Sequence, residues 1–159
     1  MATSVTAAAS WKRLSAPLRA IVARVIEGES RRAGDIGVRL TGDDELRGLN
    51  RRWRGMDRAT DVISFAYDEH EPDAATRPVS GDLAVSLDRV RAQARRFRVT
   101  PGAELARLVV HGTLHLCGHD HVRAAERRTM RAREERALRA VGVQVRELDR
   151  RWRAASRGA

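Results

Sequence analysis

Residues 111–121 read HGTLHLCGHDH, and this stretch decides both the fold and the chemistry of the chain. Residues four apart share one face of a helix, so His111 and His115 can be directed at the same metal ion. Glycine tolerates the left-handed backbone of a helix stop, so Gly118 predicts a turn that brings His121 back as a third ligand. Three imidazoles with no obvious fourth protein ligand are typical of a catalytic zinc site that leaves one position for water.

The same spacing matches the zinc-peptidase pattern H-E-x-x-H-x-x-G-x-x-H with one difference. Gly112 stands where that pattern has its glutamate, and glycine has no carboxylate with which to take a proton from water. The pattern therefore indicates a hydrolytic metal site without ordinary peptidase chemistry. The alternative is that the histidines merely decorate a helix, and their regular spacing argues against it.

The composition indicates one soluble domain with a basic surface. The chain has 159 residues and a formal net charge of +10, which favours an acidic partner such as nucleic acid. Because 30 of its 31 basic residues are arginine, this charge also fits a genome-wide compositional bias. The single cysteine excludes an internal disulfide framework and fits a reducing compartment. No stretch approaches the roughly 18 to 20 apolar residues that cross a bilayer, so we expect no membrane partner and a cytoplasmic location.

Hydrophobic periodicity and capping residues predict helices alternating with strands. The expected helices cover residues 15–27, 43–53, 87–97, 101–117 and 124–141, and the expected strands cover residues 36–41, 60–66 and 81–86. Residues 67–80, which hold most of the local acid and two prolines, are expected to form a mobile loop. We therefore expect one domain over residues 1–142, frayed over about its first ten residues, and a basic, partly disordered C-terminal tail over residues 143–159.

Several ordered motifs resemble those of the YbeY family of bacterial rRNA maturation factors, over roughly residues 36–142. The family signature H-G-x-L-H-L-x-G-Y-D-H is present, except that His119 stands where tyrosine is usual. Residues 49–65 read LNRRWRGMDRATDVISF, which matches a second family segment, and Ala66 follows where the family has proline. A third block is GDLAVS at residues 81–86, and Met130 and Glu134 match an M-x-x-x-E motif.

The resemblance implies a fold, an activity and a set of site residues. The fold would be α+β: a single zincin-like domain whose small mixed β-sheet packs with helices, with the metal site on a central helix and the following turn. Members are described as single-strand-specific endoribonucleases in the maturation of small-subunit ribosomal RNA, especially its 3′ end, and in ribosome quality control. By position, His111, His115 and His121 would bind one divalent metal ion, usually Zn²⁺, and Arg54 would be the functional arginine near it.

RNA cleavage is consistent with the missing glutamate. A metal ion can neutralise charge on the phosphate and supply an in-line nucleophile, and an arginine can bind two phosphate oxygens. Arg54 is the candidate for that role, although an arginine at a helix end is often simply solvated. The sequence does not decide whether water or the RNA 2′-OH attacks. The implied partners are single-stranded RNA or an rRNA precursor, the small ribosomal subunit and its assembly factors.

Two roles are possible for each of several other residues in this region. Glu104 could reach the site or orient a ligand, or it could serve only the helix dipole. Asp120 could hold the second ring nitrogen of a ligand histidine, or shape the turn after Gly118. We expect His119 at a packing or substrate-contact position rather than as a ligand, and Cys117 in the core.

Basic and aromatic residues outside the histidine stretch give weaker signals. Trp53 and Phe65 are expected in the core, although an exposed Trp53 could stack on a base. Eight arginines could track an RNA backbone or could be ordinary solvated residues, namely Arg51, Arg52, Arg58, Arg89, Arg91, Arg95, Arg96 and Arg98. Two rival functions remain: a metallohydrolase with another substrate, and a ribosome-associated assembly factor whose metal is mainly structural.

Overall fold

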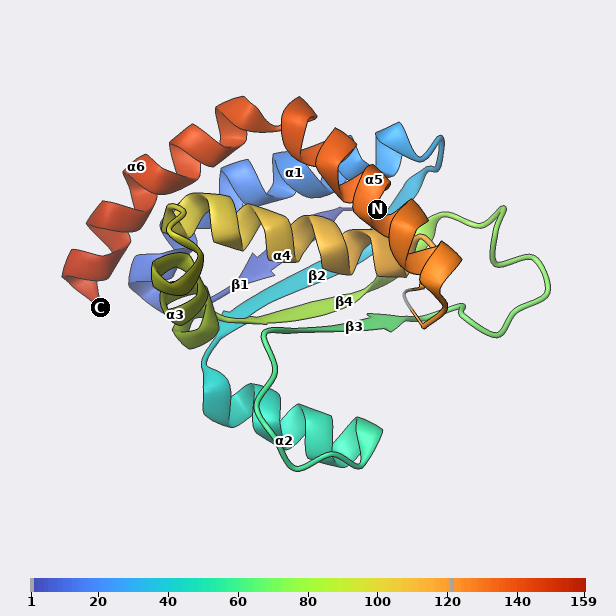
Figure 1. Ribbon diagram of the computed structural model, residues 1–159, viewed down its shortest axis with the longest axis horizontal. Coiled ribbons are helices and arrows are strands. Elements are labelled where there is room, and N and C mark those ends of the chain that lie inside the picture. The colour runs from blue at the N-terminus through green and yellow to red at the C-terminus, as the bar shows by residue number, and fades with distance from the viewer. Residues whose placement is uncertain (1, 121) are drawn as a thin grey trace.

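The computed structural model describes residues 2–120 and 122–159, and these form a four-stranded sheet packed with helices (Figure 1). The strand order is β1-β2-β4-β3, in which β1, β2 and β4 are parallel and β3 runs antiparallel to β4. The strands are β1 (Thr3–Thr6), β2 (Ala33–Thr41), β3 (Val62–Ala66) and β4 (Val79–Ser86). The helices are η1 (Ala9–Leu14), α1 (Ser15–Gly28), α2 (Asp43–Arg54), α3 (Leu87–Phe97), α4 (Pro101–Leu116), α5 (Ala124–Ala140) and α6 (Gly142–Gly158). The α+β fold expected from the sequence is confirmed.

The central helix α4 crosses one face of the sheet, with α1 beside it (Figure 1). Its start is set by Thr100, whose hydroxyl accepts a hydrogen bond from the backbone N–H of Ala103 at 3.1 Å, and by Pro101 in the first turn. Most of α4 is buried, including Leu105, Val109 and Leu114, which explains why its apolar residues surround the helix. This packing fixes the histidine-bearing end of α4 against the sheet.

The helix α2 lies on the opposite side of the sheet, below it in Figure 1. Leu46 of α2 packs there against Ile63 of β3 and Ala84 of β4 in a small separate core. Since these three side chains are at most 5% exposed, α2 is held firmly by a few contacts. Its C-terminal end therefore has a defined position beside β3.

The N-terminal residues are more ordered than expected. Thr3–Thr6 form β1, which pairs in parallel with β2, and η1 buries Trp11 and Leu14. A four-residue strand gives too short a periodic pattern to be recognised in the sequence. The residues expected to fray thus form one edge of the sheet.

Residues 143–159 differ from the expected basic tail. They continue as α6, and Leu148, Trp152 and Ala155 are buried in the main core. The rings of Trp152 and Trp11 meet edge to face, with centroids 4.7 Å apart. The two ends of the chain therefore pack on one another. Within the described residues, no helix is both long and apolar enough to span a membrane.

Candidate functional site

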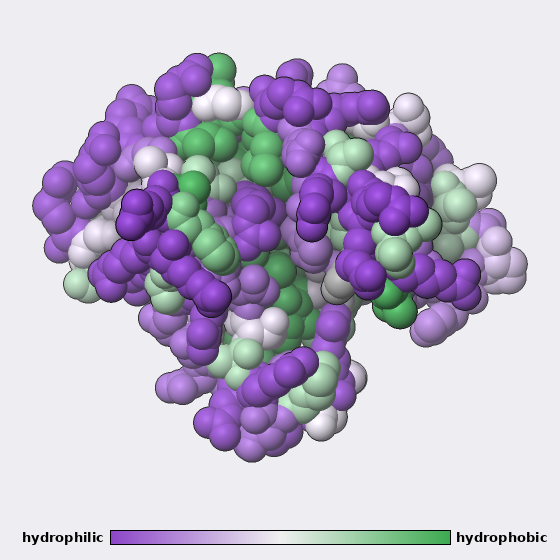
Figure 2. Space-filling view, viewed as in Figure 1, coloured by the Kyte–Doolittle hydropathy of each residue, from purple (hydrophilic) through white to green (hydrophobic). Residues whose placement is uncertain are grey.

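A cleft of about 930 Å³ lies where the last turns of α4 meet the edge strand β3. Its remaining walls are the connection between α2 and β3 and the loop between β3 and β4. Figure 2 shows this side of the molecule hollowed between the part formed by α2 and the upper body, with hydrophilic side chains on the rim. The charged and imidazole side chains lining the cleft are Arg31, Arg54, Arg58, Asp61, Asp68, Glu69, His111, His115, His119 and Asp120.

His111 and His115 point at one another in this cleft. Their Nε2 atoms are 3.1 Å apart and their ring planes are inclined by 73°. Nitrogen ligands at about 2.0–2.1 Å from a tetrahedral ion lie about 3.3–3.4 Å from each other, so the observed separation fits a shared metal ion. The spacing of four residues thus brings the two imidazole rings together on one face of α4, as the sequence predicts.

Glu134 of α5 orients the first histidine. Its carboxylate contacts Nδ1 of His111, which leaves Nε2 directed towards His115. Metal-binding imidazoles usually donate their other ring nitrogen to a carboxylate, which fixes the tautomer and raises the basicity of the ligand nitrogen. The sequence motif contained Glu134, but its role was not predicted, because it lies 23 residues beyond His111.

Gly112 is required by the close approach of α4 to the sheet. A Cβ atom there would lie 2.9 Å from Leu83 and 3.2 Å from the hydroxyl of Ser64. That hydroxyl donates to the Gly112 carbonyl at 3.2 Å. Any larger residue at this position would require the Leu83 and Ser64 side chains to shift, so the close packing of α4 on the sheet favours glycine.

Gly118 ends α4 as expected. Its φ is +100°, in the region that glycine adopts at little cost, and its N–H donates to the His115 carbonyl at 2.9 Å. His121, the third ligand predicted from the sequence, lies outside the described residues. Within the described residues, no group of three metal-binding side chains is found. The three-histidine ligand set therefore remains a prediction, of which the structure positions two members.

His119 contacts Glu29 at the end of α1, and Arg133 of α5 donates to the same carboxylate at 3.1 Å. This agrees with the packing position expected for His119. Burial, with a smaller contribution from the Glu29 charge, raises the pKa of the nearby Cys117 thiol to about 12. The Cys117 thiol is therefore less acidic than a solvent-exposed thiol.

Arg54 is the last residue of α2, and its side chain lines the cleft with the histidines. One guanidinium nitrogen donates to the Ser64 carbonyl on the edge strand β3 at 3.3 Å. The buried Asn50 donates to the Arg58 carbonyl at 3.0 Å, which secures the connection that follows α2.

The structure decides between the two alternatives for Glu104 and corrects the expectation for Trp53. Glu104 does not reach the cleft, because its carboxylate is buried and bonded to the Arg107 guanidinium at 2.5 Å. Trp53 is not a core residue: 64% of it is exposed, and only its edge meets Phe65, with centroids 6.3 Å apart. Sequence patterns place an aromatic residue on a helix face but do not reveal whether a neighbouring element covers that face.

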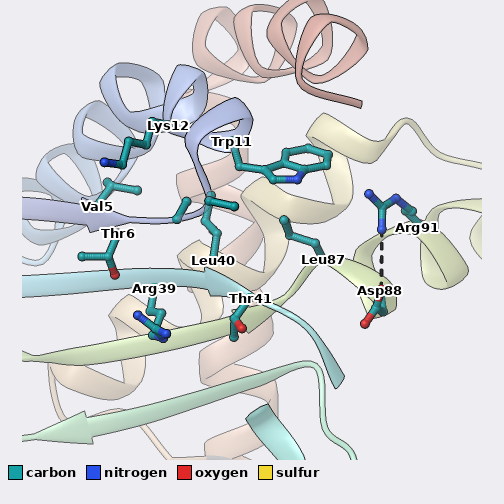
Figure 3. A pocket seen from close by; sticks show the side chains of 12 residues that line it. Val5, Thr6, Trp11, Lys12, Arg39, Leu40, Thr41, Leu87, Asp88 and Arg91 are labelled. Carbon is teal, nitrogen blue, oxygen red and sulfur yellow. Dashed lines mark ion pairs between the residues drawn. The ribbon is translucent and has the colours of Figure 1, made fainter. Parts of the chain in front are cut away.

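The arginines of α3 lie apart from the cleft. Arg91 instead lines a second cavity of about 620 Å³, at the ends of β1 and β2 and the start of α3 (Figure 3). There it pairs with Asp88 at 3.5 Å, and its guanidinium lies 5.2 Å from the ring centroid of Trp11. Arg39 of the same cavity binds Glu45 at 2.5 Å. The expectation that the α3 arginines join Arg51, Arg52 and Arg58 in one RNA track gains no support from this arrangement.

Comparisons with known proteins point to one family. The family described as "Endoribonuclease YbeY" matches residues 4–142. A protein of that name from Chloroflexus aurantiacus is 46% identical over 114 residues, which are 69% of this chain and 74% of the relative. One from Anaeromyxobacter dehalogenans is 40% identical over 145 residues, 89% of this chain and 74% of the relative. The solution structure of TM1509 from Thermotoga maritima superposes with a TM-score of 0.65 at 28% identity, covering 92% of each chain.

Proposed function

The chain belongs to the YbeY endoribonuclease family, and from this premise we propose that it is a metal-dependent endoribonuclease that cleaves single-stranded rRNA precursor. The substrate region is the 3′ end of small-subunit rRNA, and the setting is ribosome maturation and quality control in the cytoplasm. The observation that carries the proposal is the convergence of the His111 and His115 Nε2 atoms in the cleft that Arg54 lines.

In this proposal His111 and His115 hold one divalent ion, Zn²⁺, with His121 as the third ligand. Glu134 keeps the Nδ1 proton of His111, so that Nε2 remains available to the ion. A bound divalent ion polarises a phosphoryl oxygen and makes water easier to deprotonate. Imidazole ligands suit zinc as well as other first-row metals, and the lack of a thiolate is typical of catalytic rather than structural zinc sites.

Arg54 binds the scissile phosphate. Its guanidinium is anchored through one nitrogen to the Ser64 carbonyl, and its other N–H groups can meet phosphate oxygens. The anchor aligns the positive charge with the metal site before RNA arrives, so little reorganisation accompanies the reaction. The exposed Trp53, next in the chain, offers a ring on which a neighbouring base stacks.

The test is cleavage of a labelled RNA that spans the 3′ end of a small-subunit rRNA precursor. Wild-type protein should cut it, Arg54→Ala should keep its metal but fail to cut, and His115→Ala should lose both. Metal content is measured on the same preparations, and thermal unfolding confirms that the variants fold. Equal cleavage by all three proteins would contradict the proposal.

Two further readouts separate the rival functions. An assembly factor with a mainly structural metal would still support ribosome assembly after Arg54→Ala, whereas the proposed nuclease would not. A metallohydrolase with another substrate would leave RNA intact and cut a protein such as casein. Gly112 weighs against the peptidase, since it has no carboxylate with which to take a proton from water.

A further inference from the structure

The cleft has walls of opposite charge. Arg54, Arg58 and Asp61 line the wall formed by the end of α2 and the connection that follows it, so this wall has a formal charge of +1. The other wall is the loop over residues 67–78, which carries four carboxylates within six residues: Asp68, Glu69, Glu71 and Asp73. Of these, Asp68 and Glu69 line the cleft itself. Such a cluster stands out in a chain whose formal net charge is +10.

Two arginines hold this loop in place, although its composition suggested mobility. Arg31 donates to the Cys117 carbonyl at 3.1 Å, at the end of the histidine-bearing helix, and to the loop carbonyls of Ala74 at 2.9 Å and Arg77 at 3.0 Å. Within the loop, Arg77 pairs with Asp73 at 2.7 Å and Asp68 at 3.4 Å. The acidic wall is thus tied to the same helix end as the metal site.

The wall remains negative despite these arginines. The positive charges of Arg31 and Arg77 offset two of the four carboxylates, which leaves a formal charge of −2.

At the base of the loop, the Tyr67 hydroxyl donates to Asp82 at 2.7 Å. That hydrogen bond, together with partial burial and the charges of Asp82 and Asp35, raises the pKa of Tyr67 to about 12.

Resting on the proposed function, we propose that the loop over residues 67–78 selects single strands: it lets one RNA backbone lie along Arg54 and Arg58 and repels the second backbone of a duplex. A duplex carries roughly one phosphate charge per 1.7 Å of axis, shared between two backbones. When one backbone is bound at the basic wall, the other meets the carboxylates of the opposite wall. A lone strand has no second backbone to repel.

Glu69 is the residue through which to test this. It is exposed, lines the cleft and is not among the carboxylates paired with Arg77, so its replacement should leave the loop anchored. Glu135 of α5 is also exposed and does not line the cleft, which makes it a matched control. Glu69→Lys and Glu135→Lys each change the formal net charge from +10 to +12, so they differ only in where the charge lies.

The measurement is binding, by fluorescence anisotropy, of one labelled RNA alone and annealed to its complement, followed by cleavage of both. Wild type should favour the single strand. Glu69→Lys should raise relative duplex binding by roughly fivefold or more, and Glu135→Lys should change it by less than about twofold. Glu69→Gln should shift the ratio in the same direction by a smaller factor, because it removes the negative charge without adding a positive one.

Equal duplex preferences in the two lysine variants, or a wild type that binds duplex as tightly as single strand, would overturn the inference. Because binding is measured separately from cleavage, a protein that discriminates but does not cut contradicts only the proposed nuclease function. A protein that cuts both forms equally contradicts only the role of the loop.

Discussion

The cavity beside Trp11 and the cleft beside His111 lie at opposite ends of the parallel strands, and both contain basic side chains. In the cavity, each of two arginines pairs with a carboxylate: Arg39 binds Glu45. Arg91 binds Asp88 and lies close to the Trp11 ring (Figure 3). In the cleft, two groups of the same kind, the imidazoles of His111 and His115, are directed at a single point.

We infer from this difference that the cavity side chains stabilise the fold, whereas the cleft histidines serve the proposed metal site. An ion pair over an aromatic ring lowers the energy of the folded protein without any further component. Two imidazole nitrogens 3.1 Å apart are close enough to share a proton or to bind one cation beside them. Substitutions in the two regions should therefore have opposite consequences for activity and stability.

The largest expected contrast is in metal binding and cleavage. His115→Ala removes one of the two positioned ligands, so we expect it to lose its metal and at least about a thousandfold in cleavage rate. Lys12→Ala, at the far cavity, should retain both. Metal analysis and RNA cleavage on the same preparations measure the contrast. Loss of metal in Lys12→Ala, or its retention in His115→Ala, would break the comparison.

Two arginines provide the next contrast. Arg54→Ala should lower cleavage by about a hundredfold to a thousandfold while the metal and the melting temperature are retained, because the guanidinium acts on the phosphate. Arg91→Ala should leave cleavage unchanged but lower the free energy of unfolding by about 1 kcal/mol, since it loses its contact with the Trp11 ring. Urea denaturation and a cleavage assay distinguish the two variants. Lost cleavage in Arg91→Ala, or lost stability with intact cleavage in Arg54→Ala, would contradict the account.

A smaller effect is expected at Glu134. Glu134→Gln keeps the shape of the side chain but loses the charge that faces His111, so metal affinity should fall by about tenfold to a hundredfold. Competition with a chelator measures this affinity, and the adjacent, exposed Glu135→Gln is the control. If both variants bind metal like the wild type, Glu134 does not orient the ligand.

The smallest effect is expected at Trp53. With most of its ring exposed, Trp53→Ala should have little effect on folding but weaken RNA binding by about 1 kcal/mol, roughly fivefold. Trp53→Phe should restore much of the loss, because it preserves an aromatic face. Titration of single-stranded RNA against the three proteins gives the answer, and identical affinities would exclude base stacking there.

The local signals of α4 made it predictable from the sequence. Thr100 and Pro101 start the helix, Gly118 ends it, and the fourfold spacing of His111 and His115 sets their common face. The strand β3 was predicted from its content of β-forming residues, and β4 and α3 were predicted as the next strand and helix along the chain.

Long-range contacts were not predictable in this way. The short strand β1 gains its stability from pairing with β2, some 30 residues later in the chain. The helix α6 has a mostly polar sequence and is fixed by a few buried residues such as Trp152. Glu134 meets His111, and Arg31 meets Cys117, only after α1, α4 and α5 have packed together. A family motif can contain such residues, but the motif alone does not give their partners.

The central claim is that His111 and His115 bind a metal ion, and anomalous X-ray diffraction from crystals of the zinc-loaded protein, recorded at the zinc absorption edge, tests it most directly. The account predicts one strong anomalous peak about 2.0–2.1 Å from the Nε2 atoms of both histidines. A map without a peak in this cleft, or with its only strong peak elsewhere, would contradict the assignment of the metal site.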